Sequence, residues 1–200
     1  MSALSMERRN GIPVIGLGTY PLRGEALESA IAMALELGIR HIDTAQMYGN
    51  EREIGRAVRD CGLPAEQLFV VTKVDPGNTS AARFAPTVQQ SIDALGGPAD
   101  LLLIHWPPAA DALEGVLERL MNAREDGFAR QIGVSNFSPS MLRRAHALTN
   151  GAIACNQVEF HALLDQRALL AEARALGIAL SAFSPIARGA ALKAEVIQGI

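Results

Sequence analysis

The chain has 200 residues, 49% of them hydrophobic, which is enough apolar side chain for the core of one sizeable domain. Its formal net charge of −3 provides no positive field for nucleic acid or an anionic membrane, so we expect neither as a partner. The two cysteines, Cys61 and Cys155, form no CxxC pattern and have no neighbouring ligands, which predicts a reduced, metal-free protein of the cytoplasm.

The chain begins with MSALSMERRN, which contains no continuous apolar run. No later stretch approaches the roughly 20 apolar residues that cross a bilayer. We therefore expect neither a leader nor a membrane span. The first predicted strand is PVIGLG, residues 13–18.

After this strand a helical pattern that stops at a glycine recurs, followed each time by a short run rich in Val, Ile and Leu. Such a glycine closes the last helical turn in a left-handed conformation without a Cβ clash. The apolar runs are nearly continuous, which is typical of buried parallel strands. The glycines that we expect to end helices are Gly38, Gly62, Gly96, Gly127, Gly151 and Gly177.

Two helix starts carry capping signals. Asn50 with Glu53 three residues later predicts a capping box, and Ser138 followed by Pro139 predicts an N-cap with proline in the first turn.

The alternation gives seven strands, six complete helices and the start of a seventh in one domain, residues 1–200. A doubly wound sheet and a (β/α)8 TIM barrel both fit this pattern. In GLGTYP, however, Pro21 occupies the place of the third glycine of a dinucleotide fingerprint, which favours the barrel.

The chain stops at ALKAEVIQGI, so we expect a barrel truncated after its seventh strand, with the eighth strand and helix missing. Without them the first and seventh strands would expose unpaired edges. We therefore expect a fragment of a longer chain, and weak cofactor binding and poor solubility if these residues are the whole molecule.

Polar residues follow the apolar part of each later strand, and the strand ends of a β/α barrel converge on one face. We expect this face to gather Asp43, Lys73, His105, Ser135, Asn136, Asn156, Gln157 and Ser184.

Three of these groups, Asp43, Lys73 and His105, suit proton transfer together with Tyr48. A phenol is a poor acid at neutral pH, but the ammonium of Lys73 would lower the pKa of Tyr48 by stabilising the phenolate. Asp43 would keep the buried Lys73 charged. A neutral His105 would orient a carbonyl oxygen against the tyrosine hydroxyl. With a hydride donor opposite, such a cluster would reduce carbonyls.

The sequence resembles the aldo-keto reductase family through most of its length. The matching stretches are GLGTY (16–20), DTAQMYGNE (43–51), TK (72–73), LLIHWP (102–107), IGVSNF (132–137), NQVEF (156–160) and AFSP (182–185). HIDTAQMYGNE, LLLIHWP and ALKAEVI resemble segments of the bacterial 2,5-diketo-D-gluconate reductase B type.

The resemblance implies reduction of small dicarbonyls or keto-sugar acids with NADPH by a monomer, with Tyr48 as general acid beside Asp43, Lys73 and His105. Tyr20 and Trp106 would line the substrate pocket with Tyr48 and His105. Phe183 would stack on the nicotinamide, where the family usually has tyrosine. The implied cofactor contacts are Gly18, Thr19, Asp43, Ser135, Asn136, Gln157, Phe183, Ser184, Ile186 and Arg188.

Preference for NADPH over NADH rests on the resemblance alone, because the family's basic 2′-phosphate segment normally lies beyond residue 200. Three other interpretations stay open: a cofactor-sensing binding protein with vestigial redox chemistry, an inactive truncated fragment, and an aldolase-type barrel using Lys73 as a Schiff-base amine. The last needs a neutral lysine, which Asp43 opposes. Asp43 and Lys73 could also form a purely structural ion pair, and we expect Cys155 to be a core residue.

Overall fold

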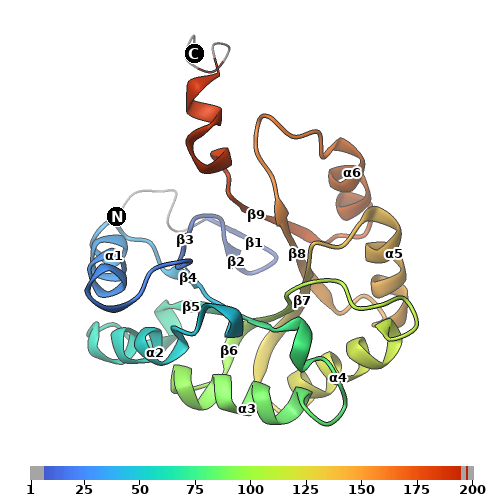
Figure 1. Cartoon of the computed structure of the whole chain (residues 1–200), viewed down its shortest axis with the longest axis horizontal. Helices are drawn as coiled ribbons and strands as arrows, with labels where there is room; N and C mark the ends of the chain where they lie inside the picture. The colour runs from blue at the N-terminus through green and yellow to red at the C-terminus, as the bar shows by residue number, and fades with distance from the viewer. Residues whose placement is uncertain (1–6, 195–196, 198–200) are drawn as a thin grey trace.

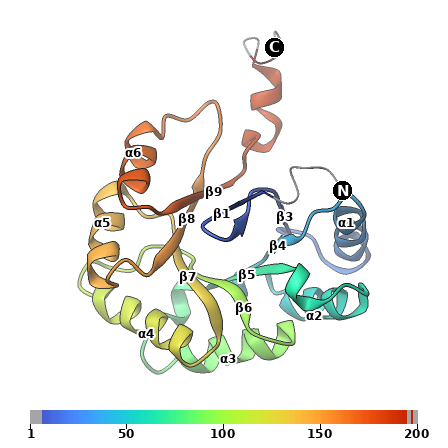
Figure 2. The same cartoon turned by 180° about the vertical axis from the view of Figure 1, so that it is seen from behind.

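The computed structural model describes residues 7–194 and 197. Seven parallel strands form one sheet in the order β3-β4-β5-β6-β7-β8-β9, which curls into an incomplete ring with the helices outside it (Figures 1 and 2). The strands are β3 (Gly16–Gly18), β4 (His41–Asp43), β5 (Phe69–Val74), β6 (Ala99–Ile104), β7 (Ala129–Ser135), β8 (Ile153–Glu159) and β9 (Ala179–Phe183). The helices are α1 (Gly24–Glu36), α2 (Glu51–Asp60), α3 (Phe84–Leu95), α4 (Leu113–Glu125), α5 (Pro139–Leu148) and α6 (Arg167–Ala175).

The strand order follows the chain without reversal, so the barrel prediction is confirmed and the doubly wound alternative is wrong. Among the described residues, β3 pairs only with β4 and β9 only with β8. Each of these two outer strands therefore has one edge without a strand partner in this part of the chain. β9 is also only partly buried, whereas β5 and β6 are buried over most of their length.

The glycine signals are confirmed, since all six predicted glycines follow their helices with φ between 69° and 87°. Ser138 is confirmed as the cap of α5, and its hydroxyl accepts from the Met141 N–H at 3.4 Å.

The predicted capping box at α2 is wrong. The Asn50 side chain, 1% exposed, is drawn into the barrel rim, where its Oδ1 accepts from Thr44 and its Nδ2 donates to the Leu22 carbonyl. Glu53 instead accepts a hydrogen bond from the backbone N–H of Gly24, at the start of α1. Both side chains therefore join neighbouring segments rather than closing their own helix.

The first predicted strand also needs correction. Ile12–Pro13 forms β2, which pairs antiparallel with β1 (Arg8–Arg9), and only Gly16–Gly18 joins the barrel. The turn between them is Asn10-Gly11 with φ of 51° and 78°, the geometry that favours Asn-Gly in tight hairpins. This dipeptide was a sequence signal for a hairpin that the prediction overlooked.

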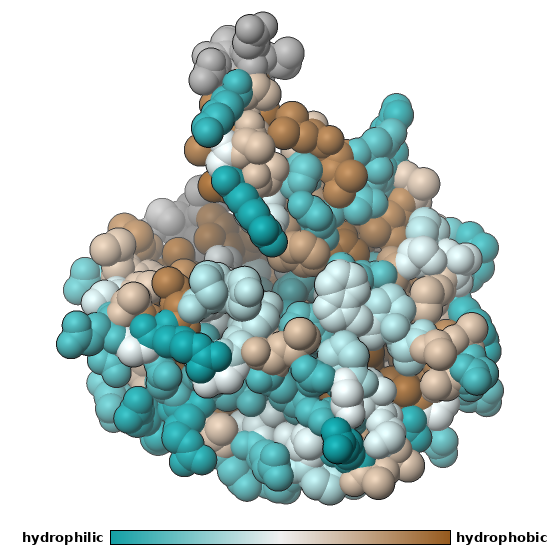
Figure 3. Space-filling model, in the orientation of Figure 1, coloured by the Kyte–Doolittle hydropathy of each residue, from teal (hydrophilic) through white to brown (hydrophobic). Residues whose placement is uncertain are grey.

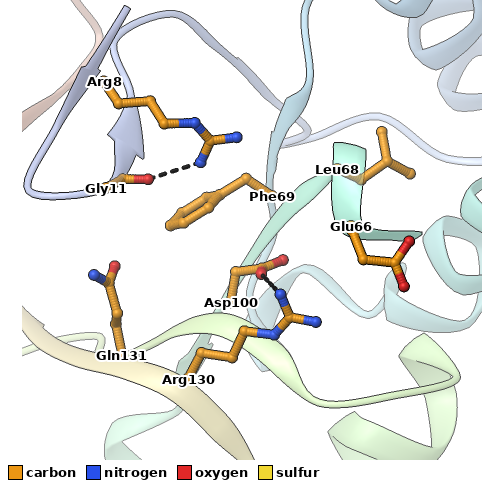
Figure 4. Close-up of a pocket in the computed structure, with 8 residues that line it drawn as sticks. All are labelled: Arg8, Gly11, Glu66, Leu68, Phe69, Asp100, Arg130 and Gln131. Carbon is orange, nitrogen blue, oxygen red and sulfur yellow. Dashed lines mark hydrogen bonds and ion pairs between the residues drawn. The ribbon is translucent and has the colours of Figure 1, made fainter. Parts of the chain in front are cut away.

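The hairpin lies against the amino-terminal ends of the strands. Gln131 on β7 donates to the Asn10 carbonyl at 2.9 Å, and Asn10 donates to the Gly177 carbonyl at 2.7 Å. Figure 4 shows a shallow pocket here, in which Arg8 extends over Phe69 and Asp100 pairs with Arg130 at 3.4 Å. This pocket is at the amino-terminal ends of the strands, away from their carboxyl ends.

The strands in the middle of the sheet, β5 to β8, bury most of both faces. Inside the barrel, Ile12, Phe69, Val71, Leu101, Leu103 and Cys155 form one cluster, while the alternate residues pack against the helices. Cys155 is fully buried, so its prediction as a core residue is confirmed. Because strand side chains alternate, the residue two positions after the last apolar inward residue also points into the barrel, at its carboxyl end.

After β9 the chain makes two short 3-10 turns, η5 (Ala187–Gly189) and η6 (Ala191–Lys193). The rest of the predicted seventh helix falls largely on residues 195–196 and 198–200, outside the described residues. Hydrophobic residues gather around this segment in Figure 3. Leu163, Leu164 and Ile186 are among the exposed hydrophobic side chains of the described residues. No helix in the described ranges is long and apolar enough to cross a membrane.

Candidate active site

Asp43 and Lys73 form a buried ion pair at the carboxyl end of the barrel. Lys73 follows Phe69 and Val71 on the inward face of β5, which places its ammonium inside. Its Nζ lies 2.5 Å from Asp43 Oδ1 and donates to the Thr44 carbonyl at 2.8 Å. The Lys73 side chain is only 1% exposed, so the carboxylate and carbonyl replace the water that it has lost.

Tyr48 lies beside this pair. It ends the 3-10 turn η2 (Gln46–Tyr48), and its Oη is 3.4 Å from Lys73 Nζ. The same nitrogen is 5.0 Å from the centre of the phenol ring. The structure therefore brings the predicted proton donor within reach of the predicted cation.

The net pKa of Tyr48 differs from the sequence prediction. Burial raises the pKa of this phenol above its ordinary value, and the lowering effect of Lys73 does not fully offset it. Lys73 thus acts in the predicted direction, but the dry surroundings of the ring dominate in this structure.

His105 follows Leu101 and Leu103 on the inward face of β6. Its ring meets the Tyr48 ring edge to face, with centroids 5.7 Å apart. Burial, and secondly the charge of Lys73, lower the pKa of His105 to about 4, so the imidazole is neutral at pH 7. Its Nδ1 has no hydrogen-bond partner among the described residues.

Three of the predicted cofactor residues form a chain of hydrogen bonds beside the four predicted catalytic residues, Asp43, Tyr48, Lys73 and His105. Gln157 Nε2 donates to Asp43 Oδ2 at 2.7 Å, and the Ser135 hydroxyl donates to the Gln157 carbonyl at 2.8 Å. Asn136 Nδ2 donates to Ser135 Oγ at 3.0 Å and to the His105 carbonyl at 3.1 Å. These residues therefore connect Asp43 to His105 around the rim.

Gly18 and Thr19 differ in what they offer a ligand. Gly18 pairs with Asp43 in the sheet, and nothing lies within 4 Å of where a Cβ would be, so the backbone there is open to close approach. Thr19 is fully buried and its hydroxyl donates to the Asp43 carbonyl at 2.8 Å. Its side chain is therefore not open to a ligand, and instead fixes the backbone of Asp43.

The predicted residues after β9 lie on a strained, accessible segment. Phe183 is half-buried at the end of the strand, Ser184 and Arg188 have φ of 49° and 52°, and Ile186 is exposed. Within the described residues, no side-chain hydrogen bond joins this segment to Asp43, Tyr48, Lys73 or His105.

The two predicted substrate aromatics are exposed. Tyr20 packs its ring 5.1 Å from that of Tyr48, while Trp106 lies in the loop after β6. They are 66% and 48% exposed.

Asn156 was wrongly expected at the common face. It stands between the inward Cys155 and Gln157 and so points outward, where its amide bonds the backbone of Phe137 on both sides. The sequence reasoning also missed Gln46, whose amide makes four hydrogen bonds behind Tyr48.

A parallel barrel with this polar cluster at its carboxyl ends defines a β/α-barrel enzyme. The model of the aldo/keto reductase family matches residues 14–199. The chain therefore belongs to this family and to the oxidoreductases, as the sequence predicted.

Individual relatives agree. The chain is 38% identical over 193 residues to the methylglyoxal reductase DkgB of Escherichia coli O157:H7, covering 94% of this chain and 72% of the relative. It is 41% identical over 203 residues to an aldo-keto reductase of Mycolicibacterium smegmatis, covering 98% and 72%.

Solved structures show the same likeness. A crystal structure described as that of "a putative 2,5-diketo-D-gluconic acid reductase B" has a TM-score of 0.91 at 37% identity, covering 96% of this chain and 68% of that one. An aldo-keto reductase of Bombyx mori in complex with NADP has a TM-score of 0.77 at 32% identity, covering 86% and 62%.

Proposed function

We propose that this protein reduces small aldehydes and ketones to alcohols with NADPH, and that dicarbonyls and keto-sugar acids are its substrates. The observation that carries the proposal is the contact of Tyr48 Oη with Lys73 Nζ at 3.4 Å, with Asp43 paired to the same ammonium. The relatives named for methylglyoxal and 2,5-diketo-D-gluconic acid support the substrate class.

Tyr48 would give its proton to the carbonyl oxygen as that oxygen gains negative charge. The raised pKa of Tyr48 keeps the phenol protonated at neutral pH, which is the form that can donate. Lys73 would stabilise the phenolate left behind, because an ammonium at this distance favours the charged form. Asp43 would hold that ammonium in place through a 2.5 Å contact.

His105 would orient the carbonyl. Because its pKa of about 4 leaves the ring neutral at pH 7, it can donate one N–H without competing as an acid. A carbonyl oxygen between the His105 and Tyr48 rings could accept from both side chains. Tyr20 and Trp106 would exclude water around the rest of the substrate.

The residues present fit a nicotinamide. Gly18 leaves open backbone, and Asn136 keeps its Oδ1 out of the hydrogen bonds of the described residues, so it could accept from the carboxamide. Gln157 and Ser135 would fix that amide in place, and Phe183 offers a partly exposed ring for stacking. When bound, NADPH would supply the hydride to the carbonyl carbon. Ser184, Ile186 and Arg188 would approach its pyrophosphate.

The test is the loss of NADPH absorbance with methylglyoxal and with 2,5-diketo-D-gluconate, run beside NADH and a fluorescence titration of each cofactor. We expect binding and turnover with NADPH. Tight binding without turnover on any carbonyl would instead favour the cofactor-sensing interpretation. Absence of both would refute the proposal and favour the inactive-fragment interpretation.

We also propose a single-domain monomer of the cytoplasm, where the free thiols of Cys61 and Cys155 would stay reduced. Sedimentation at several concentrations tests the monomer, and a mass that rises with concentration would contradict it.

A further inference from the structure

Two side chains hold the turn that carries Tyr48. Arg23 donates to the carbonyls of Tyr48 and Gly49, and Gln46 within the turn bonds the segments around Lys73. Gln46 opens η2, two residues before Tyr48, and its amide makes four hydrogen bonds. Its Oε1 accepts from the Asp75 N–H and from Asn78 Nδ2, both at 2.9 Å. Its Nε2 donates to the Thr87 carbonyl at 3.2 Å and to Ser91 Oγ at 3.1 Å.

These four bonds use the whole capacity of the amide, which has two donors and two acceptor positions. They also fix its orientation, because the Asp75 N–H can only donate and so requires the oxygen. No polar atom of the Gln46 side chain remains for a substrate or cofactor. Gln46 can therefore act on the site only indirectly, by fixing the positions of the groups that it bonds.

Those groups flank Lys73. Asp75 follows Lys73 by two residues, beyond the end of β5, and is held directly by Gln46. On the other side, Ser91 donates to Glu51 Oε2 at 3.2 Å, and Thr72 donates to Glu51 Oε1 at 2.5 Å. Gln46 is thus connected to the chain on both sides of Lys73. It bonds Asp75 directly, and it reaches Thr72 through Ser91 and Glu51.

We propose that Gln46 is a positioning residue that sets the separation between Tyr48 and Lys73. The 3.4 Å contact between Tyr48 Oη and Lys73 Nζ joins the turn η2 to the strand β5. Because η2 is not a strand, no sheet hydrogen bonds fix its distance from β5. Gln46 bridges these segments within two residues of each partner. The strength of a charge interaction depends on this separation, so loosening the bridge weakens the effect of Lys73 on the phenol.

This inference deepens the proposed function but is tested without turnover. The chain has two tyrosines, so biosynthetic replacement with difluorotyrosine gives two fluorine NMR signals, and Tyr20→Phe leaves that of Tyr48. The fluorinated phenol ionises at lower pH, which keeps the titration within the range of the folded protein. The titration midpoint then reports the Lys73–Tyr48 interaction directly.

Gln46→Met keeps the length of the side chain and removes all four bonds. We expect it to raise the Tyr48 midpoint by about one pH unit, since an opposite charge at this range shifts a pKa by one to three units. Gln131→Met is the matched control, because it removes a glutamine bond at the opposite end of the barrel, and it should leave the midpoint unchanged.

An unchanged midpoint in Gln46→Met would overturn the inference. A lowered midpoint would also overturn it, because Gln46 would then act by keeping water from the phenol. If Gln46→Met does not fold, Asn78→Ala removes one of the four bonds and should raise the midpoint by a smaller amount.

In the turnover assay, Gln46→Met should lower kcat on the order of 10-fold with little change in KM for the carbonyl, as expected for a displaced acid. If the parent protein shows no turnover, but Gln46→Met raises the Tyr48 midpoint as expected, the proposed function is wrong and the positioning role stands. If the parent protein turns over, but Gln46→Met leaves the Tyr48 midpoint unchanged, the proposed function stands and the positioning role is wrong.

Discussion

Gln157 donates its side-chain N–H to Oδ2 of Asp43 at 2.7 Å, so the carboxylate that pairs with Lys73 is held from both sides of the barrel. One oxygen of Asp43 serves the ammonium and the other serves the amide. The ion pair is therefore a junction between β4 and β8 as well as a part of the site. A substitution of Asp43 should therefore change both the stability of the fold and the proposed proton transfer.

Asp43→Asn should show the effect on stability. The substitution leaves the Lys73 ammonium buried without its counter-ion, and removing one partner of a buried pair costs about 3 to 5 kcal/mol. Because Asp43 is partly exposed, we expect about 3 kcal/mol, read as the free energy of unfolding in urea. Equal stability of the two proteins would mean that water reaches Lys73 freely.

His105 should make the protein less stable in acid. Its pKa is lowered from 6.5 to about 4 on folding, so the unfolded chain binds the proton more readily. The stabilisation is complete above about pH 6.5 and is lost as the pH falls toward 4. Since the ring lies at the barrel mouth, solvent screening reduces the effect to about 1 to 2 kcal/mol.

The measurement is urea unfolding at several pH values between 7 and 4, with His105→Gln compared to the unchanged protein. The variant should lose less stability over that interval. Some acid sensitivity will remain, because burial also lowers the pKa of His41. Parallel curves for the two proteins would count against a buried, neutral His105.

Gly55→Ala tests the packing behind the site. Within a helix this change normally stabilises by about 1 kcal/mol. Here the added Cβ would lie 2.2 Å from the Ala94 carbonyl oxygen of α3, so α2 and α3 must separate. We expect a net loss of about 1 to 3 kcal/mol, as for overpacked cores.

Gly115→Ala is its control, because the new Cβ in α4 would meet only the movable end of Arg119 at 3.3 Å. Thermal unfolding should show Gly55→Ala below the parent and Gly115→Ala at or above it. The opposite order would show that α2 and α3 are not in close contact.

The sequence predicted the parts of this fold that depend on short-range rules. Each helix end needed a left-handed residue, and glycine marked all six. The inward placement of Asp43, Lys73 and His105 follows from strand alternation plus the apolar positions before them. The resemblance of the motifs to those of aldo-keto reductases then implied reduction of carbonyls with NADPH.

Other features depended on tertiary contacts that no local pattern specifies. Asn50 and Glu53 have the spacing of a capping box, yet each found a stronger partner on another segment. Asn156 was assigned to the site although alternation from Gln157 turns it outward, so a stricter use of the same rule would have excluded it. The net pKa of Tyr48 depended on how deeply its ring is buried, which spacing does not give.

The most direct test of the account compares Tyr48→Phe with the unchanged protein in NADPH-dependent reduction of methylglyoxal. Loss of the donor proton should lower kcat by about 10²-fold to 10⁴-fold, while NADPH affinity and the unfolding free energy stay close to the parent values. A variant that turns over as fast as the parent would contradict the central claim that the Tyr48 phenol, supported by Lys73, protonates the substrate.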